Sequence, residues 1–203
     1  MEKQQKETSV NIINKHEERA AYFFYIPKHD ELVICPFYKD SLVYTRDGNK
    51  EFTKIASKME NTLCYVLSMV FDDKTDRLFL TKCNFESEIW QRQSSGEYKL
   101  FQKLPEAHSI VHLPLTNTLV LGGDCTLEVY IMKGNEKYEL VENTLGAPVY
   151  DIIGMCFDKQ SSTLAVLILS IVRLFKLCGN GKLEFLGTIE NQSGDRANSV
   201  AFL

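Results

Sequence analysis

The chain has 203 residues, of which 44% are hydrophobic and 25% charged, a composition typical of a globular domain. Its formal net charge of −4 argues against a surface built for nucleic acid, because phosphate binding depends on clustered Lys and Arg. Residues 1–20 are polar and no run of about 18 apolar residues occurs, so we expect neither a secretory signal nor a membrane span. The sequence therefore predicts an intracellular protein, cytoplasmic or nuclear.

After this polar tail, one pattern of predicted elements occurs four times. An apolar strand runs into a polar turn, and a second strand then begins at a leucine. The first strands are predicted at residues 22–26, 65–71, 110–113 and 152–157, and the leucines are Leu32, Leu78, Leu119 and Leu164. These leucines are 46, 41 and 45 residues apart. Such a period is typical of the blades of a β-propeller, which repeat at about 40–45 residues.

A third strand with an aromatic residue follows each leucine. The aromatics are Tyr44, Trp90, Tyr130 and Phe175, which lie 12, 12, 11 and 11 residues after their leucines. A glycine-containing turn comes next, because Gly and Asn tolerate positive φ in a hairpin. The fourth strands, at residues 52–56, 98–104, 138–142 and 183–189, are more polar, as expected of an outer edge strand.

These elements predict an all-β chain: a β-propeller-type array of four-stranded antiparallel blades. The predicted parts are a tail at 1–20, blades at about 21–61, 62–107, 108–148 and 149–192, and the first strand of a fifth blade at 193–203. Three accounts of the ring stay open. The chain is a fragment of a longer propeller, which we favour, or an open arc completed by a partner. The third account is a small closed ring in which residues 9–13 and the C-terminal strand share a blade.

With this repeat, the chain resembles the WD-repeat propeller family over about residues 20–203, and the third unit is the nearest match. Ala107-His108 stands where that family has Gly-His, Gly122-Gly123-Asp124 stands at its tight turn, and Tyr130 stands at its usual Trp position. The resemblance implies a hydrogen-bonded structural network of His108, Asp124 and Tyr130. No Trp-Asp dipeptide occurs, and kelch-like and quinoprotein-like propellers remain as sibling classes.

The resemblance further implies a platform for other proteins. We therefore expect a non-catalytic protein–protein interaction scaffold in a multi-subunit assembly, with proteins or peptides as partners. The expected contact regions are the loops between fourth and first strands, at residues 57–63, 105–109, 143–149 and 191–198. The alternative is a propeller enzyme or ligand-binding domain with a site at the central channel, but only His112 and Asp151 interrupt the apolar innermost strands.

No catalytic, cofactor-binding or metal site is predicted, and the chain is not expected to be an enzyme. His108 and His112 are four residues apart in a predicted strand, which separates them by about 13 Å, too far to share one metal ion. The acidic turn at 72–76 lacks the Gly and late Glu of a calcium loop. The six cysteines form no C-x-x-C pair and are predicted to be reduced and buried.

Overall fold

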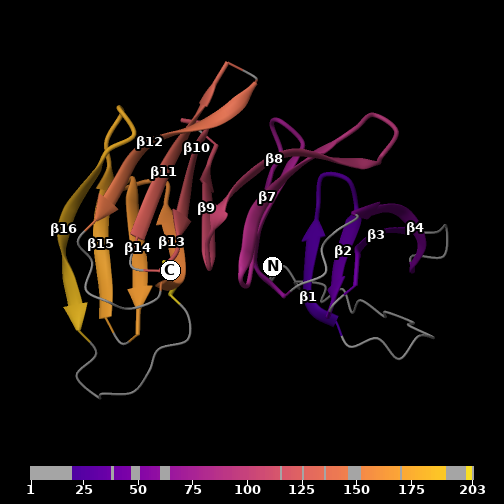
Figure 1. Cartoon of the computed structure of the whole chain (residues 1–203), viewed down its shortest axis with the longest axis horizontal. Helices are drawn as coiled ribbons and strands as arrows, with labels where there is room; N and C mark the ends of the chain where they lie inside the picture. Colours follow the sequence, from indigo (N-terminus) through magenta and orange to yellow (C-terminus); the bar gives the residue numbers. More distant parts are fainter. Residues whose placement is uncertain are drawn as a thin grey trace, which may run out of the picture. The chain divides into compact units, whose positions relative to one another are not determined.

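A computed structural model describes residues 20–37, 39–46, 51–59, 65–114, 116–124, 126–134, 136–145, 152–169, 171–190 and 200–202. Sixteen strands in this part of the chain form four separate four-stranded sheets, and no described residue is helical. Strands that follow one another in the chain are neighbours in each sheet (Figure 1). Accordingly, the described chain holds no helix of the length and hydropathy that crossing a bilayer requires.

The strands of the four sheets follow the predicted repeat. The first sheet holds β1 (Ala20–Ile26), β2 (Glu31–Pro36), β3 (Ser41–Arg46) and β4 (Phe52–Met59). The second holds β5 (Val66–Asp72), β6 (Arg77–Lys82), β7 (Phe85–Arg92) and β8 (Tyr98–Glu106). The third holds β9 (Ser109–Leu113), β10 (Thr118–Gly122), β11 (Thr126–Lys133) and β12 (Lys137–Leu145). The fourth holds β13 (Ile152–Asp158), β14 (Thr163–Ile168), β15 (Ile171–Leu177) and β16 (Leu183–Glu190).

The chain divides into two compact units. One unit is Met1–Tyr65 with Ser94–Tyr98, and the other is Val66–Gln93 with Lys99–Leu203. In the second unit β9 contacts both β5 and β13, so its three sheets meet through their first strands. Propeller blades meet around their axis in this way. The prediction of an all-β, propeller-type array of four-stranded antiparallel blades is confirmed.

The near-constant spacing between leucine and aromatic has a simple structural cause. In every sheet the leucine of the second strand is the direct antiparallel partner of the aromatic on the third strand. The four pairs are Leu32–Tyr44, Leu78–Trp90, Leu119–Tyr130 and Leu164–Phe175. Cross-strand pairs of aromatic and aliphatic side chains stabilise a sheet, so this pair fixes the register of each blade.

The turn before each leucine also repeats. The residue two positions before the leucine has a left-handed backbone: Asp30, Asp76, Asn117 and Ser162 have φ between 50° and 55°. In the second unit the carbonyl of this residue accepts a hydrogen bond from the third strand, from Arg92, Met132 and Leu177 respectively. Asp and Asn tolerate this conformation better than most residues, and the turn therefore aligns the ends of three strands.

The second unit has two hydrophobic cores, each between successive sheets. Leu119 and Leu121 of β10 belong to the core shared with the second sheet, together with Phe79 and Ile89. Val120, the residue between them, belongs to the core shared with the fourth sheet. Because both faces of the third sheet are covered, all five residues of β10 are buried. The sheets therefore stack face to face, as the repeat requires.

The structure corrects the boundaries of the expected contact loops. Residues 57–59, 105–106 and 143–145 continue the fourth strands, and Ser109 already belongs to β9. Pro105 is tolerated in β8 because an outermost strand leaves one row of N–H groups unpaired. The rest of the tail, residues 60–63, 146–149 and 191–198, and most of the expected fifth blade lie outside the described residues, while residues 200–202 form no strand.

Candidate functional site

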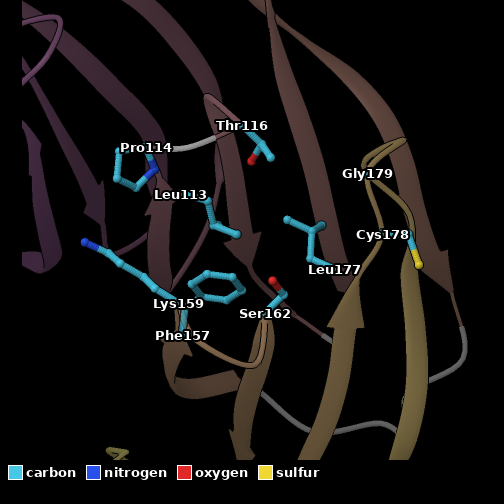
Figure 2. A pocket seen from close by; sticks show the side chains of 9 residues that line it. All are labelled: Leu113, Pro114, Thr116, Phe157, Lys159, Ser162, Leu177, Cys178 and Gly179. Atoms are coloured by element: carbon cyan, nitrogen blue, oxygen red, sulfur yellow. The ribbon is translucent and has the colours of Figure 1, made fainter.

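A pocket of about 190 Å³ lies between the third and fourth sheets, where three turns gather at one end of the strands. Leu113, Phe157 and Leu177 form its apolar wall (Figure 2). Leu113 and Leu177 are almost fully buried, whereas Phe157 is half-buried. The complete lining is Leu113, Pro114, Thr116, Phe157, Lys159, Ser162, Leu177, Cys178 and Gly179. The pocket therefore combines an apolar interior with a few polar groups.

The turns around the pocket are held by backbone hydrogen bonds. The Ser162 carbonyl accepts a hydrogen bond from the Leu177 N–H at 3.0 Å, which joins the β13–β14 turn to β15. Cys178 N–H donates to the Lys182 carbonyl at 2.8 Å and closes the β15–β16 turn. That turn packs closely on the third sheet, because a Cβ at Gly181, where φ is +82°, would lie 2.5 Å from Ile131 Cδ1. The walls are therefore preformed.

The equivalent position in the preceding interface, between the second and third sheets, is filled by side chains. There the residue before the leucine is Arg77, whose guanidinium lies 4.0 Å from the Phe101 ring and contacts the Met132 sulfur at 3.6 Å. The corresponding residue of the third sheet is the much smaller Thr118. Tyr138 is the cross-strand partner of Met132 in the third sheet. In the fourth sheet the equivalent partner, opposite Leu177, is Leu183. Two smaller side chains thus stand at the positions that Arg77 and Tyr138 occupy in the preceding sheets.

A buried polar cluster fills the interface between the second and third sheets. His112 Nε2 lies 3.2 Å from Asn117 Oδ1 and 3.4 Å from the Tyr138 hydroxyl, which donates to Asn117 Oδ1 at 2.9 Å. His112 Nδ1 lies 3.9 Å from Asp72 Oδ1. The imidazole stacks on Phe79 with ring centroids 4.9 Å apart. Tight packing of rings and hydrogen bonds leaves this cluster without access for a ligand.

Burial governs the titration of the cluster. It lowers the pKa of His112 below the usual 6.5, although the Asp72 carboxylate opposes the shift. It also raises the pKa of Tyr138 to about 12. Desolvation disfavours the charged form of each group, so both side chains stay neutral near pH 7. A neutral imidazole and a neutral phenol fit a structural role between two sheets.

The structure brings together two of the three residues in the predicted network. His108 Nε2, just before the third sheet, lies 3.5 Å from Asp124 Oδ1. Tyr130, however, donates its hydroxyl to Glu128 Oε2 at 2.6 Å. The same arrangement occurs in the second sheet, where Trp90 Nε1 donates to Glu88 Oε2 at 3.0 Å. In both sheets a Glu stands two residues before the aromatic. This spacing is the sequence signal that could have predicted the hydrogen bond between the two side chains.

The sequence offers two residues for a channel site, and the structure describes only one of them. His112 is buried between two sheets, and Asp151 lies outside the described residues. No group of three or more His, Cys, Asp or Glu in the described part of the chain is placed to hold a metal ion. The four cysteines that the structure describes, Cys35, Cys83, Cys156 and Cys178, are free thiols. Burial raises the pKa of the Cys156 thiol, and a hydrogen bond with the backbone of Phe202 opposes this shift.

Repeated sheets that meet through their first strands define an all-β protein of propeller type. Its fold is similar to that of a periplasmic gluconolactonase from Pseudomonas aeruginosa, with a TM-score of 0.68 and 12% identity over 84% of this chain and 57% of that one. It is also similar to a functionally unknown protein from Desulfotomaculum acetoxidans, with a TM-score of 0.67 and 12% identity over 83% of this chain and 55% of that one. The chain thus spans less than two thirds of either structure. No protein family and no curated protein matches it in sequence.

These comparisons correct the predicted function. The expectation of a non-catalytic protein–protein interaction scaffold is wrong, because the shared fold is that of a propeller enzyme. The finding favours the alternative, a propeller enzyme or ligand-binding domain. These findings do not test four other expectations, which stay predictions. They are the resemblance to WD repeats, the absence of catalysis, the protein partners and the intracellular location.

Proposed function

We propose that the chain is a small-molecule-binding propeller domain whose site is the pocket between the third and fourth sheets. The observation that carries the proposal is the apolar wall of Leu113, Phe157 and Leu177 beside three polar side chains. Ligand sites generally combine an apolar lining with a few polar groups that orient the ligand. The pocket also reaches the ends of the first strands β9 and β13, through Leu113 and Phe157.

The volume limits the size of the ligand. Drug-sized molecules occupy pockets of about 300–1,000 Å³, whereas an apolar cavity of about 150 Å³ accommodates benzene. A pocket of about 190 Å³ therefore suits a molecule with a body close to one six-membered ring. Among the nine lining residues none is His, Asp or Glu, the usual general bases, which supports binding rather than acid–base chemistry.

The test is a titration of the whole protein, labelled at its leucine methyl groups, with benzyl alcohol as a neutral single-ring probe. We expect the methyl signals of Leu113 and Leu177 to shift in a saturable way. The signals of Leu80, which is fully buried in β6, should not move. The proposal fails if the signals of Leu113 and Leu177 stay in place throughout the titration.

A second candidate is hydrolysis of a sugar lactone, which the fold shared with gluconolactonase favours. Water would add to the lactone carbonyl, the ring C–O bond would break, and a hydroxy acid would form. Continuous titration of acid released from glucono-1,5-lactone measures this reaction directly. A rate no higher than that of buffer alone would dismiss this candidate and leave the binding proposal standing.

A further inference from the structure

We infer that the ligand of this pocket is a small organic anion: a monocarboxylate whose apolar body is about the size of one ring. The inference rests on the proposed function, because it assigns a chemical class to the same site. It follows from two features of the lining, namely its charge and its hydroxyl groups.

The charge of the lining is positive. Lys159 is the only lining residue that is ordinarily charged at pH 7, since no carboxylate is among the nine. No ion pair or hydrogen bond holds its ammonium group within the described residues, and the side chain is exposed. Figure 2 shows the Lys159 side chain extending from beside Phe157 to a position below Pro114, on the side away from Leu177 and Ser162. A cation at the mouth of an apolar pocket favours a ligand with one negative charge.

Two acidic groups, Asp158 and Glu184, lie near the pocket without lining it. Asp158 accepts hydrogen bonds from the Gln160 N–H, the Ser161 N–H and the Ser161 hydroxyl of its own turn, at 3.1, 3.0 and 2.6 Å. These bonds, the Ser161 hydroxyl first, lower the pKa of Asp158. Glu184 lies 3.9 Å from the Cys178 sulfur and forms part of β16. Neither carboxylate is among the residues that line the pocket.

A second ammonium group lies at the same mouth. Lys74 Nζ donates a hydrogen bond to the Pro114 carbonyl at 3.1 Å. The β5–β6 turn that carries Lys74 also carries Asp72, Asp73 and Asp76. Lys74 itself does not line the pocket, and we therefore assign the contact with the anion to Lys159.

The hydroxyl groups complete the polar side of the pocket. Ser162 and Thr116 both line it, and no other side chain or backbone group in the described residues hydrogen-bonds their hydroxyls. Figure 2 shows the Ser162 hydroxyl between the Phe157 ring and Leu177. One ammonium and two hydroxyls suit the two oxygens of a carboxylate, whereas a phosphate group usually requires several backbone N–H groups or an Arg. The ring would then contact Leu113, Phe157 and Leu177.

The experiment compares benzoate with benzamide, which has the same shape but no charge. Binding to the whole protein is measured at low salt by calorimetry or by displacement of benzyl alcohol. Exposed charge pairs are worth about 0.2–1 kcal/mol, so we expect benzoate to bind more tightly by a factor of roughly 1.4 to 5. The preference should disappear in Lys159→Gln and at high salt, because salt screens an exposed pair.

Lys176→Gln is the matched control. Lys176 is also exposed and lies on β15, but it alternates with Phe175 and Leu177, which face the third sheet, so it points to the other side. The preference for benzoate should persist in this variant. Equal affinities of benzoate and benzamide, or a preference unchanged in Lys159→Gln, would overturn the assignment of an anion while the pocket stands. Failure of benzoate, benzamide and benzyl alcohol alike to bind would overturn the proposed function as well.

Discussion

The two interfaces of the second unit are built on one plan and differ in what fills them. Between the second and third sheets, Arg77 and Tyr138 reach across, and a hydrogen-bonded cluster around His112 occupies the space. Between the third and fourth sheets, Thr118 and Leu183 stand at the corresponding positions, and a pocket remains. In a repeat protein, substitution at two equivalent positions can therefore change a structural interface into a binding site without altering the fold.

The largest expected effect is a difference in stability loss between the two interfaces, because one is filled and the other contains the pocket. Phe79 is fully buried between His112 and Tyr138, whereas Phe157 is half-buried beside the pocket. We expect Phe79→Ala to lower the free energy of unfolding by about 3–5 kcal/mol, since it leaves a cavity in a filled interface. Phe157→Ala should cost about 1–2 kcal/mol, because less apolar surface loses contact. Urea unfolding measures both, and equal losses would contradict the comparison.

The second prediction concerns a substitution that makes the interface between the third and fourth sheets resemble the one between the second and third. Leu183→Tyr places a ring where Tyr138 stands in the preceding sheet and should fill the pocket. We expect the affinity for benzyl alcohol to fall by about tenfold or more, a change of about 1.4 kcal/mol, with the free energy of unfolding kept within about 1.5 kcal/mol. The control is Leu186→Tyr, on the exposed side of the same strand. Unchanged binding in Leu183→Tyr would place the ligand elsewhere.

A smaller effect tests the polar cluster. Tyr138→Phe removes the donor to Asn117 Oδ1 and keeps the ring that packs on Phe79. We expect a loss of about 1 kcal/mol in the free energy of unfolding, the usual net value of one hydrogen bond. Chemical denaturation of the variant at pH 7 gives this number. If stability is unchanged, the cluster does not hold the two sheets together.

The smallest expected effect is a dependence on pH. Because burial lowers the pKa of His112 in the folded protein, the unfolded chain takes up a proton first as the pH falls. Stability should therefore be complete well above pH 6.5 and decrease below it, until the lowered folded-state pKa is passed. Between pH 7.5 and 6 the loss is at most about 0.8 kcal/mol. The difference in pH dependence between wild type and His112→Gln isolates the contribution of His112. This contribution would be zero if His112 had the same pKa in the folded and unfolded states.

Sequence alone predicts most of the fold and little of the site. The spacing from leucine to aromatic is visible because both residues are partners in one ladder, as in Leu78 and Trp90. The pocket is not visible in the same way. It depends on which side chains from separate sheets meet, and Thr118 and Leu183 look like ordinary strand residues in the sequence. His112 marks a polar position on an apolar strand, but only the structure shows that it faces a neighbouring sheet.

The most direct test of the binding site is a crystal structure of the whole chain grown with benzoate. We predict a ring against Leu113, Phe157 and Leu177, with its carboxylate on the side of Lys159 and Ser162. A structure in which this pocket holds only water, while benzoate occupies another site or none, would contradict the assignment of an anion to this pocket.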